Sequence, residues 1–408
     1  MTKIKDIDCH KIVNSRGDWT IQTRVVLEDG SVGIQTIPDG ASKGKKEAVY
    51  VTPEKSVELV THVIKEAITG IDAFDQGKID RTLVEIDGTE NKKHLGANSI
   101  LSVSLASSKA AAQSKNIPLY KYLAELYKNT EKLVIPTPVF NILNGGKHAS
   151  NDLSFQEFMV IPAKKLPFDE QYEMGVNIYH TLEKNLEKAG QDVGVGDEGG
   201  FAPNGLNPKT ALEFIKDSAS EKYKVGTDVF LGMDVAADSF KDVMNYFIEE
   251  EGLHLSTDGL VDYYRELLKH NPIIYLEDPF YEEDFDGWKK IYKEFASNLM
   301  VVADDLTVTN PLILEELLPM KLHNAVIVKP NQVGSLTETF EFIRIAKENN
   351  MMITVSHRSG DTAEDTFIAD LAVAVGADFI KSGAPARGER VAKYNRLMEI
   401  FLDLKEIT

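Results

Sequence analysis

This chain of 408 residues is poor in cysteine, has fewer basic than acidic residues and contains no long apolar run. Cys9 is the single cysteine, which excludes an intrachain disulfide and a cysteine-based metal site. The 45 Lys and Arg against 64 Asp and Glu, a net charge of −19, argue against nucleic acid as a partner, because phosphate binding needs basic surface. No apolar run approaches the roughly 20 residues of a membrane span, and residues 1–6 lead into no signal-peptide core. We therefore expect a cytoplasmic protein that acts on a small molecule. An anionic substrate stays open, since a few local cations can dominate a closed site.

The composition and the local patterns predict an α/β protein of two domains. An apolar fraction of 43% and a charged fraction of 27% are ordinary for a globular protein. A parallel barrel alone takes about 250 residues. We expect an α+β domain over residues 1–128 and a βα barrel over residues 129–408. Within the first domain the patterns predict a hairpin at 21–37 and helices at 54–68 and 98–114.

Short apolar runs recur through the second half of the chain, and each leads into an ionisable residue. These residues are Asp234, Glu277, Asp304, Lys329, His357 with Arg358 and Ser359, and Lys381. Their successive spacings are 43, 27, 25, 28 and 24 residues. Intervals of 24 to 28 residues fit one strand, one helix and two loops, so they predict consecutive βα units. Because catalytic side chains project from the C-terminal ends of the strands in such a barrel, we expect these residues to share one rim.

Three carboxylates of this rim predict a metal site. Asp234, Glu277 and Asp304 each directly follow a buried-strand pattern, whereas most acidic residues simply face solvent. Carboxylates without cysteine or metal-spaced histidine favour a hard cation, for which Mg²⁺ is the usual choice. A substrate carboxylate bound to this ion would be neutralised, and its α-proton would become more acidic.

The lysines and the His-Arg pair on the same rim predict a base beside an anion site. Desolvation, a nearby divalent cation and the ammonium group of Lys381 would lower the pKa of Lys329 and let it act as a base. The alternative is a lysine that only extends from the end of a barrel strand into solvent. Arg358, next to His357, offers a guanidinium fork that suits phosphate better than lysine does.

Upstream segments carry two further carboxylates. Glu157 lies between two phenylalanines and is equally compatible with the solvent face of a strand. Glu198 lies in the glycine-rich segment 194–200, which is either a tight acidic turn or a place where the backbone comes close to a ligand. If both face the rim, they can protonate a leaving hydroxyl opposite Lys329. The glycine-bearing segment 39–44 is either a surface loop or a mobile lid.

Seven motifs, in order along nearly the whole chain, resemble those of the enolase family. They include Gly196-Asp197-Glu198-Gly199-Gly200 and Ser356-His357-Arg358-Ser359-Gly360, and the others lie at residues 95–98, 144–148, 276–280, 303–310 and 381–387. The resemblance implies an α+β domain that caps an eight-stranded barrel with a partly antiparallel start. It also implies a glycolytic and gluconeogenic lyase, which dehydrates 2-phosphoglycerate reversibly to phosphoenolpyruvate, and a homodimer or an octamer built from dimers.

The resemblance further implies a role for each site residue. Asp234, Glu277 and Asp304 match the ligands of a first, conformational Mg²⁺, and Ser42 matches the lid serine that binds a second, catalytic Mg²⁺. The catalytic positions match Lys329 as the base, Glu198 as the acid, Glu157 as its assistant, and His357 near the leaving hydroxyl. The substrate contacts match His148, Gln156, Glu157, Glu277, Asp304, Lys329, Arg358, Ser359 and Lys381.

Departures from the family pattern concentrate in the lid. Asp39 and Lys43 stand where the motif usually has serine and threonine, and the acidic loop after Ala48 is shortened. Trp19 replaces a usual proline. None of these changes removes a catalytic group; they bear on lid closure and on affinity for the second metal.

Two other functions are compatible with parts of this pattern. A related lyase or racemase for a different carboxylate would need a changed acid or phosphate pocket, yet Glu157, Glu198, Arg358 and Ser359 are all present. A non-catalytic binding role would predict damage to the lysines or the carboxylate trio, and the sequence shows none. Such a role, at the cell surface or after secretion without a signal peptide, can also coexist with catalysis.

Overall fold

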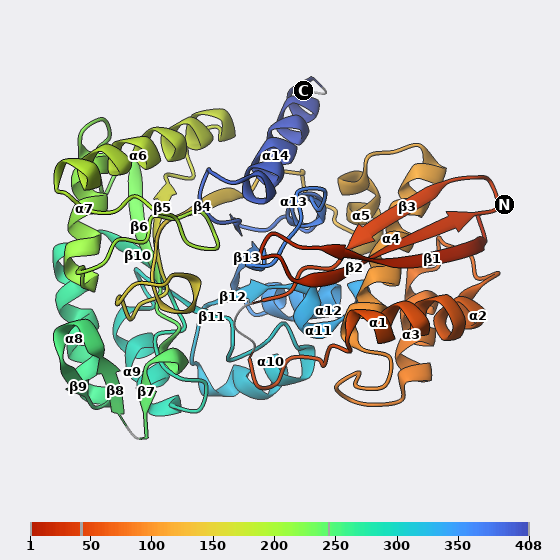
Figure 1. Cartoon of the computed structure of the whole chain (residues 1–408), viewed down its shortest axis with the longest axis horizontal. Coiled ribbons are helices and arrows are strands. Elements are labelled where there is room, and N and C mark those ends of the chain that lie inside the picture. Colours follow the sequence, from red (N-terminus) through yellow and green to blue (C-terminus); the bar gives the residue numbers. More distant parts are fainter. Residues whose placement is uncertain (1, 41–43, 244, 407–408) are drawn as a thin grey trace.

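The computed structural model describes residues 2–40, 44–243 and 245–406, which form two parts that lie side by side (Figure 1). The first is a three-stranded sheet with helices against it, and the second is a closed barrel of eight strands. A third, small sheet is formed by the segment that follows barrel strand β6 (Val229–Asp234) in the sequence and precedes helix α8 (Thr257–His270). Among the described residues, no helix is both long and apolar enough to span a bilayer. The predicted α/β class, a barrel preceded by an α+β domain, is confirmed.

The first part is an antiparallel meander covered by a long buried helix. Its strands are β1 (Ile4–Val13), β2 (Trp19–Leu27) and β3 (Val32–Thr36). The hairpin predicted at residues 21–37 is confirmed as β2 and β3, and Gly30 between them has a φ of 90°, which glycine adopts without strain. Helix α4 (Ala97–Lys115) packs so closely on β3 that a Cβ at Gly33 would lie 1.9 Å from the carbonyl oxygen of Ala106.

The remaining helical segments of the first part pack around this sheet and against helix α4. They are α1 (Pro53–Glu58), the π-helical turn η1 (Leu59–Ile64), α2 (Lys65–Ile68), α3 (Gln76–Asp87) and α5 (Leu119–Tyr127). The first three are continuous, so the helix predicted at residues 54–68 is confirmed, with a widened turn in its middle. It begins where the Thr52 side chain accepts a hydrogen bond from the backbone N–H of Lys55, and Pro53 occupies the first helical position, where no N–H is needed.

Eight strands close the barrel, in the order β10-β11-β12-β13-β14-β4-β5-β6. Besides β6 they are β4 (Thr137–Asn144), β5 (Glu157–Pro162), β10 (Ile273–Glu277), β11 (Met300–Ala303), β12 (Ala325–Val328), β13 (Met352–Ser356) and β14 (Phe379–Lys381). Neighbours are parallel except where β5 takes part, because β5 runs antiparallel to both β4 and β6. The six apolar runs of the sequence are strands β6 and β10 to β14, so the predicted rhythm is confirmed.

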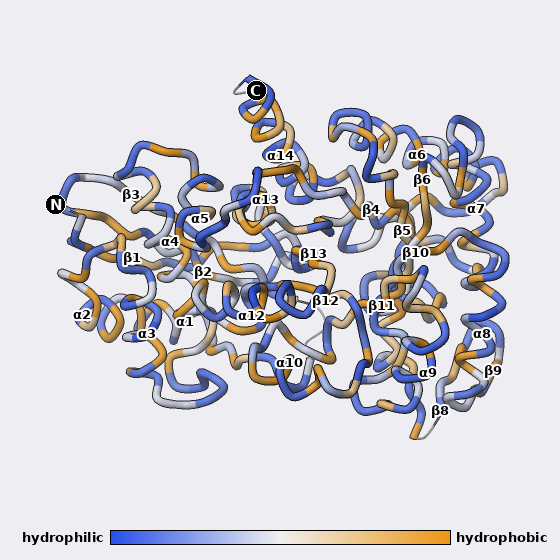
Figure 2. The backbone as a smooth tube through the Cα atoms, turned by 180° about the vertical axis from the view of Figure 1, so that it is seen from behind, coloured by the Kyte–Doolittle hydropathy of each residue, from blue (hydrophilic) through white to orange (hydrophobic). Residues whose placement is uncertain are grey.

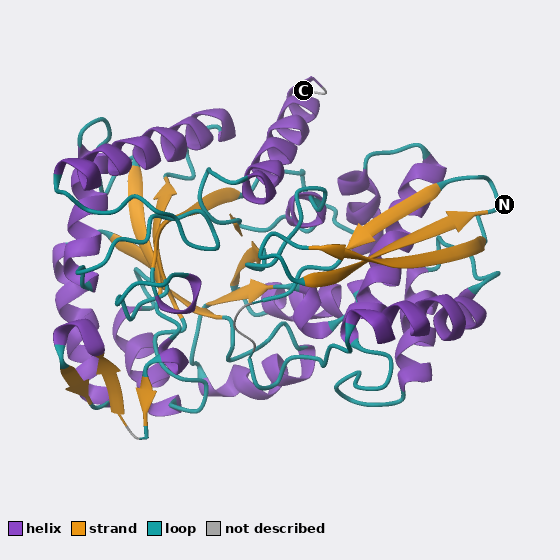
Figure 3. Ribbon diagram, viewed as in Figure 1, coloured by secondary structure: helices purple, strands orange, loops and turns teal. Residues whose placement is uncertain are grey.

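Helices surround the barrel strands, as Figure 3 shows. Besides α8 they are α6 (Phe168–Lys188), α7 (Pro208–Ser220), α9 (Phe285–Phe295), α10 (Pro311–Leu317), α11 (Pro330–Val333), α12 (Leu336–Glu348), α13 (Phe367–Ala374) and α14 (Gly388–Glu406). The short elements are the turns η2 (Gly146–His148), η3 (Ala237–Ser239), η4 (Glu249–Glu251) and η5 (Leu318–Met320) and the small sheet of β7 (Lys241–Asp242), β8 (Asn245–Ile248) and β9 (Leu253–Leu255). Asn207 and Asn310 cap α7 and α10 ahead of a proline, as Asn-Pro pairs predict.

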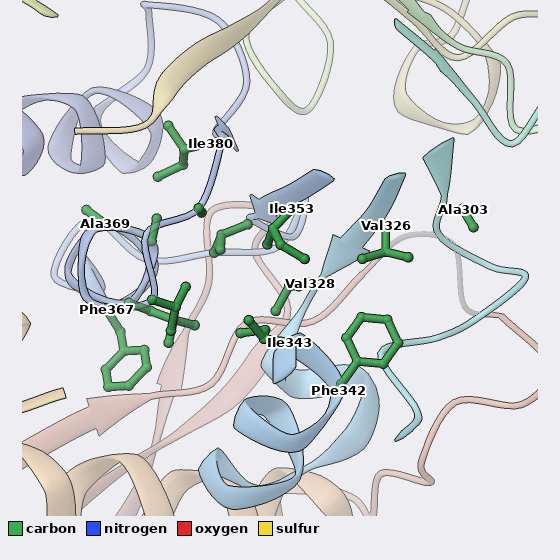
Figure 4. Close-up of a cluster of buried hydrophobic side chains, with 14 of the residues drawn as sticks. Ala303, Val326, Val328, Phe342, Ile343, Ile353, Phe367, Ala369 and Ile380 are labelled. Atoms are coloured by element: carbon green, nitrogen blue, oxygen red, sulfur yellow. The ribbon is translucent and has the colours of Figure 1, made fainter. Parts of the chain in front are cut away.

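Apolar side chains pack both inside the barrel and between its strands and helices. The interior cluster consists of Val139, Met159, Ile161, Tyr275, Met300, Val302, Ala325, Ile327 and Phe379. On the outer side, Val326 and Val328 of β12 lie beside Phe342 and Ile343 of α12 (Figure 4). Figure 2 shows the apolar character concentrated along strands such as β5 and β6. Burying one such side chain contributes about 1.5–3 kcal/mol, so these clusters fix the positions of the strand ends.

Polar contacts join the first part to the top of the barrel. Asp39 and Gly360 exchange backbone hydrogen bonds of 2.8 Å in both directions, as in a short sheet bridge. The side-chain oxygens of Thr36 and Thr362 lie 2.8 Å apart. The chain that leaves β3 is therefore anchored over the segment that follows β13, and it reaches the barrel rim.

His323, buried just before β12, makes the stability of the fold depend on pH. Burial lowers its pKa to about 4 from 6.5, so the unfolded chain binds a proton more readily than the folded one between these values. Its contribution is fully present above pH 6.5 and is lost as the pH falls towards 4. Urea unfolding measures the free energy of unfolding at each pH. Between pH 6.5 and pH 4 we expect this free energy to fall by about 3 kcal/mol more in the wild type than in His323→Gln.

The matched control is His180→Gln, which removes an imidazole that is 61% exposed. This variant should retain the pH dependence of the wild type. Equal pH dependence in His323→Gln and in the wild type would contradict the assignment.

Candidate active site

Successive barrel strands bring the expected ionisable residues to one rim. Asp234 and Glu277 end the neighbouring strands β6 and β10, where they are paired in register. Asp304 and Lys329 directly follow β11 and β12, and Lys381 ends β14. Because these strands are parallel, their C-terminal ends lie at the same end of the barrel. The rim therefore holds three carboxylates and two amines.

Glu157 reaches the same rim because its strand is reversed. Glu157 is the first residue of β5, and because β5 runs antiparallel to β6, this first residue pairs with Asp234 at the end of β6. Its side chain is only 2% exposed, which excludes the solvent face of a strand as its environment. The reversed strand thus adds a fourth carboxylate that a parallel strand would have placed at the opposite end.

Glu198 lies in the loop between α6 and α7, and its neighbours hold it against the rim. The amide nitrogen of Asn141 on β4 donates to its carboxylate at 3.0 Å. The surrounding glycines allow a close approach of the backbone, since a Cβ at Gly196 would lie 2.5 Å from the carbonyl oxygen of His148. Residues 196–200 are therefore built into the site, whereas Gly194 and Val195 remain exposed.

One pocket collects most of the expected residues. Its lining residues are Gly40, His148, Gln156, Glu157, Glu198, Asp234, Lys329, Ser356, His357, Arg358, Ser359 and Lys381. Asp304 lines an adjoining pocket together with Asp278 and Asp305. Ser42 and Lys43 lie outside the described residues.

The ammonium group of Lys381 lies among three buried carboxylates. Its Nζ is 2.9 Å from Asp234 Oδ2, 2.9 Å from Glu277 Oε2 and 3.2 Å from Glu157 Oε2. Burial opposes a charge on Lys381, but these carboxylates outweigh it and hold its pKa well above the ordinary value. Burial and the neighbouring Asp234 raise the pKa of Glu277 to about 8. Lys381 thus contacts three carboxylates whose burial and mutual repulsion favour a proton, and a further cation would relieve that repulsion.

Lys329 is paired with Asp304. Its Nζ donates to Asp304 Oδ2, and the amide nitrogen of Gln332 donates to the other carboxylate oxygen at 2.9 Å. Burial disfavours the charged amine, but Asp304 and Glu277 outweigh it, so the pKa of Lys329 lies above its ordinary value. This contact with a carboxylate opposes the lowering of the pKa that we expect from desolvation, Mg²⁺ and Lys381 together.

Glu157 and Glu198 form a buried acid pair next to two imidazoles. His148 Nδ1 lies 3.6 Å from Glu157 Oε1 and 3.4 Å from Glu198 Oε2, and His357 Nε2 lies 3.4 Å from Glu198 Oε1. Burial and the charge of Glu198 raise the pKa of Glu157 well above its ordinary value. Burial acts on Glu198 in the same sense, but the two imidazoles outweigh it and hold its pKa well below the ordinary value. A proton shared by the pair is therefore favoured on Glu157 over Glu198.

Arg358 follows barrel strand β13 and contacts residues of the first part of the chain. Its Nη1 donates to both carboxylate oxygens of Glu47, at 3.2 and 3.1 Å, and both side chains are at most 7% exposed. Burial opposes a charge on Arg358, but Glu47 outweighs it and keeps the pKa of the guanidinium above its ordinary value. Gly40 packs against the same group, since a Cβ there would lie 2.0 Å from Nη2. Residues of the first part are thus fitted to this arginine.

The carboxylates of the rim fit a hard divalent cation. Glu277 is fully buried, and its Oε1 has no hydrogen-bond partner within the described residues. Such an oxygen is costly to bury unless a cation binds it, and the available donors are oxygens, which Mg²⁺ prefers. Of the expected trio, Asp304 alone belongs to a group of described residues whose ligand atoms lie within 4.8 Å of one another, and Lys381 contacts both other carboxylates. Those groups, in the described chain, are His148 with Glu157 and Glu198, and Asp278 with Asp304 and Asp305.

Two further residues touch the site without having been assigned from the sequence. Asp278 accepts hydrogen bonds of 2.9 Å from the backbone N–H groups of both Asp304 and Asp305, and so shapes the loop after β11. Its position directly after Glu277 could have identified Asp278 as a site residue from the sequence. Glu47 offers no comparable signal, because its partner Arg358 is more than 300 residues away in the sequence.

Two family models match the chain in succession. The enolase N-terminal domain matches residues 4–123, and the enolase C-terminal TIM barrel domain matches residues 132–407. The first segment contains the meander and its helices, and the second contains the barrel with the rim.

A cation that binds the rim should stabilise the folded protein. Mg²⁺ at 100 times its dissociation constant adds about 2.7 kcal/mol, because it binds the folded state alone. We expect Mg²⁺ to raise the Tm of the wild type and EDTA to reverse the rise, whereas Glu277→Gln should show almost none. Differential scanning fluorimetry measures both.

Asp262→Asn is the control for a nonspecific loss of charge, because that carboxylate is 72% exposed. It should keep the full response to Mg²⁺. An undiminished rise in Glu277→Gln would contradict a cation site at the rim.

Proposed function

This chain belongs to the enolase family, and we propose that it catalyses the reversible dehydration of 2-phosphoglycerate to phosphoenolpyruvate, a reaction of glycolysis and gluconeogenesis. The observation that carries this proposal is the single pocket lined by Lys329, Lys381, Arg358 and the Glu157–Glu198 pair. Loss of water from a phosphorylated hydroxy acid needs a base, a fixed cation, an anion clamp and an acid, and these residues are of those types.

Lys329 is the proposed base for the C2 proton of the substrate. Asp234, Glu277 and Asp304 would hold Mg²⁺, which would make the C2 proton of a bound substrate more acidic. If Asp304 binds this ion, its carboxylate would no longer hold the proton of Lys329; the amine could release that proton to solvent and then accept the one from C2. Lys381 keeps its charge and faces the negative charge that develops on the substrate carboxylate.

Glu157 and Glu198 are the proposed acid pair for the departing C3 hydroxyl. Burial and the charge of Glu198 favour a proton on Glu157, and burial keeps water from competing for it. We propose that this proton passes from Glu157 to Glu198 and from there to the departing hydroxyl, with His148 between the two carboxylates. His357 contacts the other oxygen of Glu198 and keeps that carboxylate oriented.

Arg358 and Ser359 form the proposed phosphate site. Arg358 is an always charged, planar donor at the pocket wall, and its guanidinium is positioned by Glu47 and Gly40. Gln156, whose amide nitrogen lies 3.4 Å from Asp234 Oδ2, lines the same pocket and completes the proposed contacts to the substrate.

Several finer assignments rest on the family alone. These are the second Mg²⁺ with Ser42 as a ligand, the homodimer or octamer, the cytoplasmic location and the division of the chain at residue 128.

The direct test is the rise in ultraviolet absorbance when phosphoenolpyruvate forms from 2-phosphoglycerate. We expect turnover with Mg²⁺ and none after EDTA. Absence of any Mg²⁺-dependent signal would overturn the proposal in favour of a related lyase acting on another carboxylate.

Lys329→Ala should abolish this turnover while leaving the stabilisation by Mg²⁺ in place. A positioned base contributes roughly 10²–10⁴-fold to a rate, so we expect kcat to fall by at least two orders of magnitude. The control is Lys289→Ala, which truncates an exposed lysine outside the site. Substantial residual turnover in Lys329→Ala would rule out this base.

Gly40→Ala should raise the KM for 2-phosphoglycerate about tenfold, because the added methyl would displace the Arg358 guanidinium and weaken a charged hydrogen bond. Steady-state kinetics measures the effect. Gly388→Ala is the matched control, since a Cβ there meets no atom within 4 Å. An unchanged KM in Gly40→Ala would show that the guanidinium does not contact the phosphate.

A further inference from the structure

Helix α14 carries an arginine whose guanidinium is completely buried beneath the site. Arg390 has no exposed surface, although the helix passes along the outside of the barrel. Its Nη1 lies 2.5 Å from His357 Nδ1 and donates to the carbonyl oxygen of Arg358 at 2.8 Å. Its Nη2 donates to the carbonyl oxygens of Ser359 and, at 3.4 Å, Asp197. Arg390 does not line the pocket, so it acts through the residues that do.

The contact between Arg390 and His357 has only one consistent polarity. A guanidinium has N–H groups and no acceptor, so the imidazole nitrogen that faces it must carry the lone pair. An imidazolium, which has a proton on both nitrogens, cannot accept this hydrogen bond. The proton of a neutral His357 is therefore on Nε2, which lies 3.4 Å from Glu198 Oε1.

We propose that Arg390 is a positioning residue that locks His357 as a neutral imidazole with its proton on Nε2, so that the histidine always donates towards the Glu198 carboxylate. This inference rests on the proposed function for its catalytic meaning, but the tautomer itself does not. In this role His357 orients the acid pair and does not itself exchange a proton with the substrate.

The charges around His357 act in the same direction. Burial and the guanidinium of Arg390 lower the pKa of His357 to about 3, and the ammonium of Lys381 adds to this, whereas Glu198 opposes it. On the same helix, Glu389 Oε1 lies 3.6 Å from Arg390 Nε, and Lys393 pairs with Asp361 at 2.7 Å. A proton on His357 would place a second buried cation directly against Arg390.

Arg390 also ties the phosphate segment to the acid loop. The carbonyl groups that it binds belong to residues 358 and 359 of the proposed phosphate site and to residue 197, next to Glu198. One side chain therefore fixes the distance between the two halves of the site. We expect its loss to affect substrate affinity as well as turnover.

The tautomer can be read by ¹⁵N NMR of protein labelled at histidine, with the His357 signals assigned by their disappearance in His357→Gln. In the wild type we expect the proton on Nε2 and no titration of His357 between pH 5 and pH 9. In Arg390→Met we expect a mixture of tautomers or a titration within that range. A wild-type His357 that carries its proton on Nδ1, or that is an imidazolium at neutral pH, would overturn the proposal.

Kinetics separates the two contributions of Arg390. Arg390→Met should lower kcat on the order of 100-fold, the lower end of what a positioned acid–base group contributes, and should raise KM. Arg390→Lys keeps a donor for Nδ1 but lacks the planar guanidinium fork that spans the carbonyl groups of residues 197, 358 and 359, so it should restore kcat and the tautomer more than KM. Failure of Arg390→Lys to restore the tautomer would count against the proposed hydrogen bond.

Lys393→Met is the matched control, because it removes another fully buried cation from the same helix without touching His357. It should leave the His357 tautomer unchanged, and the same change of tautomer in both variants would contradict a specific role of Arg390. If Arg390→Met does not fold, the wild-type spectrum and Arg390→Lys still decide. If the chain does not dehydrate 2-phosphoglycerate but His357 shows the expected tautomer, the proposed function fails and the tautomer assignment stands.

Discussion

Compensation of buried negative charge is the constraint on which this structure depends. The barrel rim removes four carboxylates from water, and the ammonium group of Lys381 contacts Asp234, Glu277 and Glu157 at 2.9 to 3.2 Å. Removal of a single partner from such an arrangement leaves an uncompensated buried charge, which lowers the free energy of unfolding by about 3–5 kcal/mol. The repulsion between these carboxylates, which raises the pKa of Glu277, is what a divalent cation at the rim would relieve. The Asp304 carboxylate holds the pKa of Lys329 above its ordinary value in the same way.

Most of the barrel could be predicted from the sequence, because buried parallel strands are continuous apolar runs with regular spacing. The runs before Asp234, Glu277, Asp304 and Lys329 gave the strands and their order along the rim. The reversed direction of β5 could not be read from periodicity, since an apolar run has the same pattern in both directions. It followed from the family resemblance alone. Glu157 was ambiguous for that reason: its place at the rim is a property of the strand direction.

The partners of the site residues were less predictable than the residues themselves. Glu47 meets Arg358, and Arg390 meets His357, only because distant segments fold together, and nothing in their local sequence identifies them. The contact of Lys329 with Asp304 was unforeseen for a related reason, and the sign of a pKa shift depends on whether a carboxylate or an ammonium is in contact. Residue type and spacing thus indicate which groups a site contains, whereas their protonation is decided by contacts between elements.

The ion pair between Glu47 and Arg358 also bears on how such a protein can change during evolution. One partner belongs to the sheet-and-helix part and the other to the barrel, and both are buried where the two meet. A recombination event that exchanged the first part for an unrelated cap would remove the carboxylate and the glycine that fit this guanidinium. A different cap would therefore have to supply its own carboxylate and its own small residue at this guanidinium.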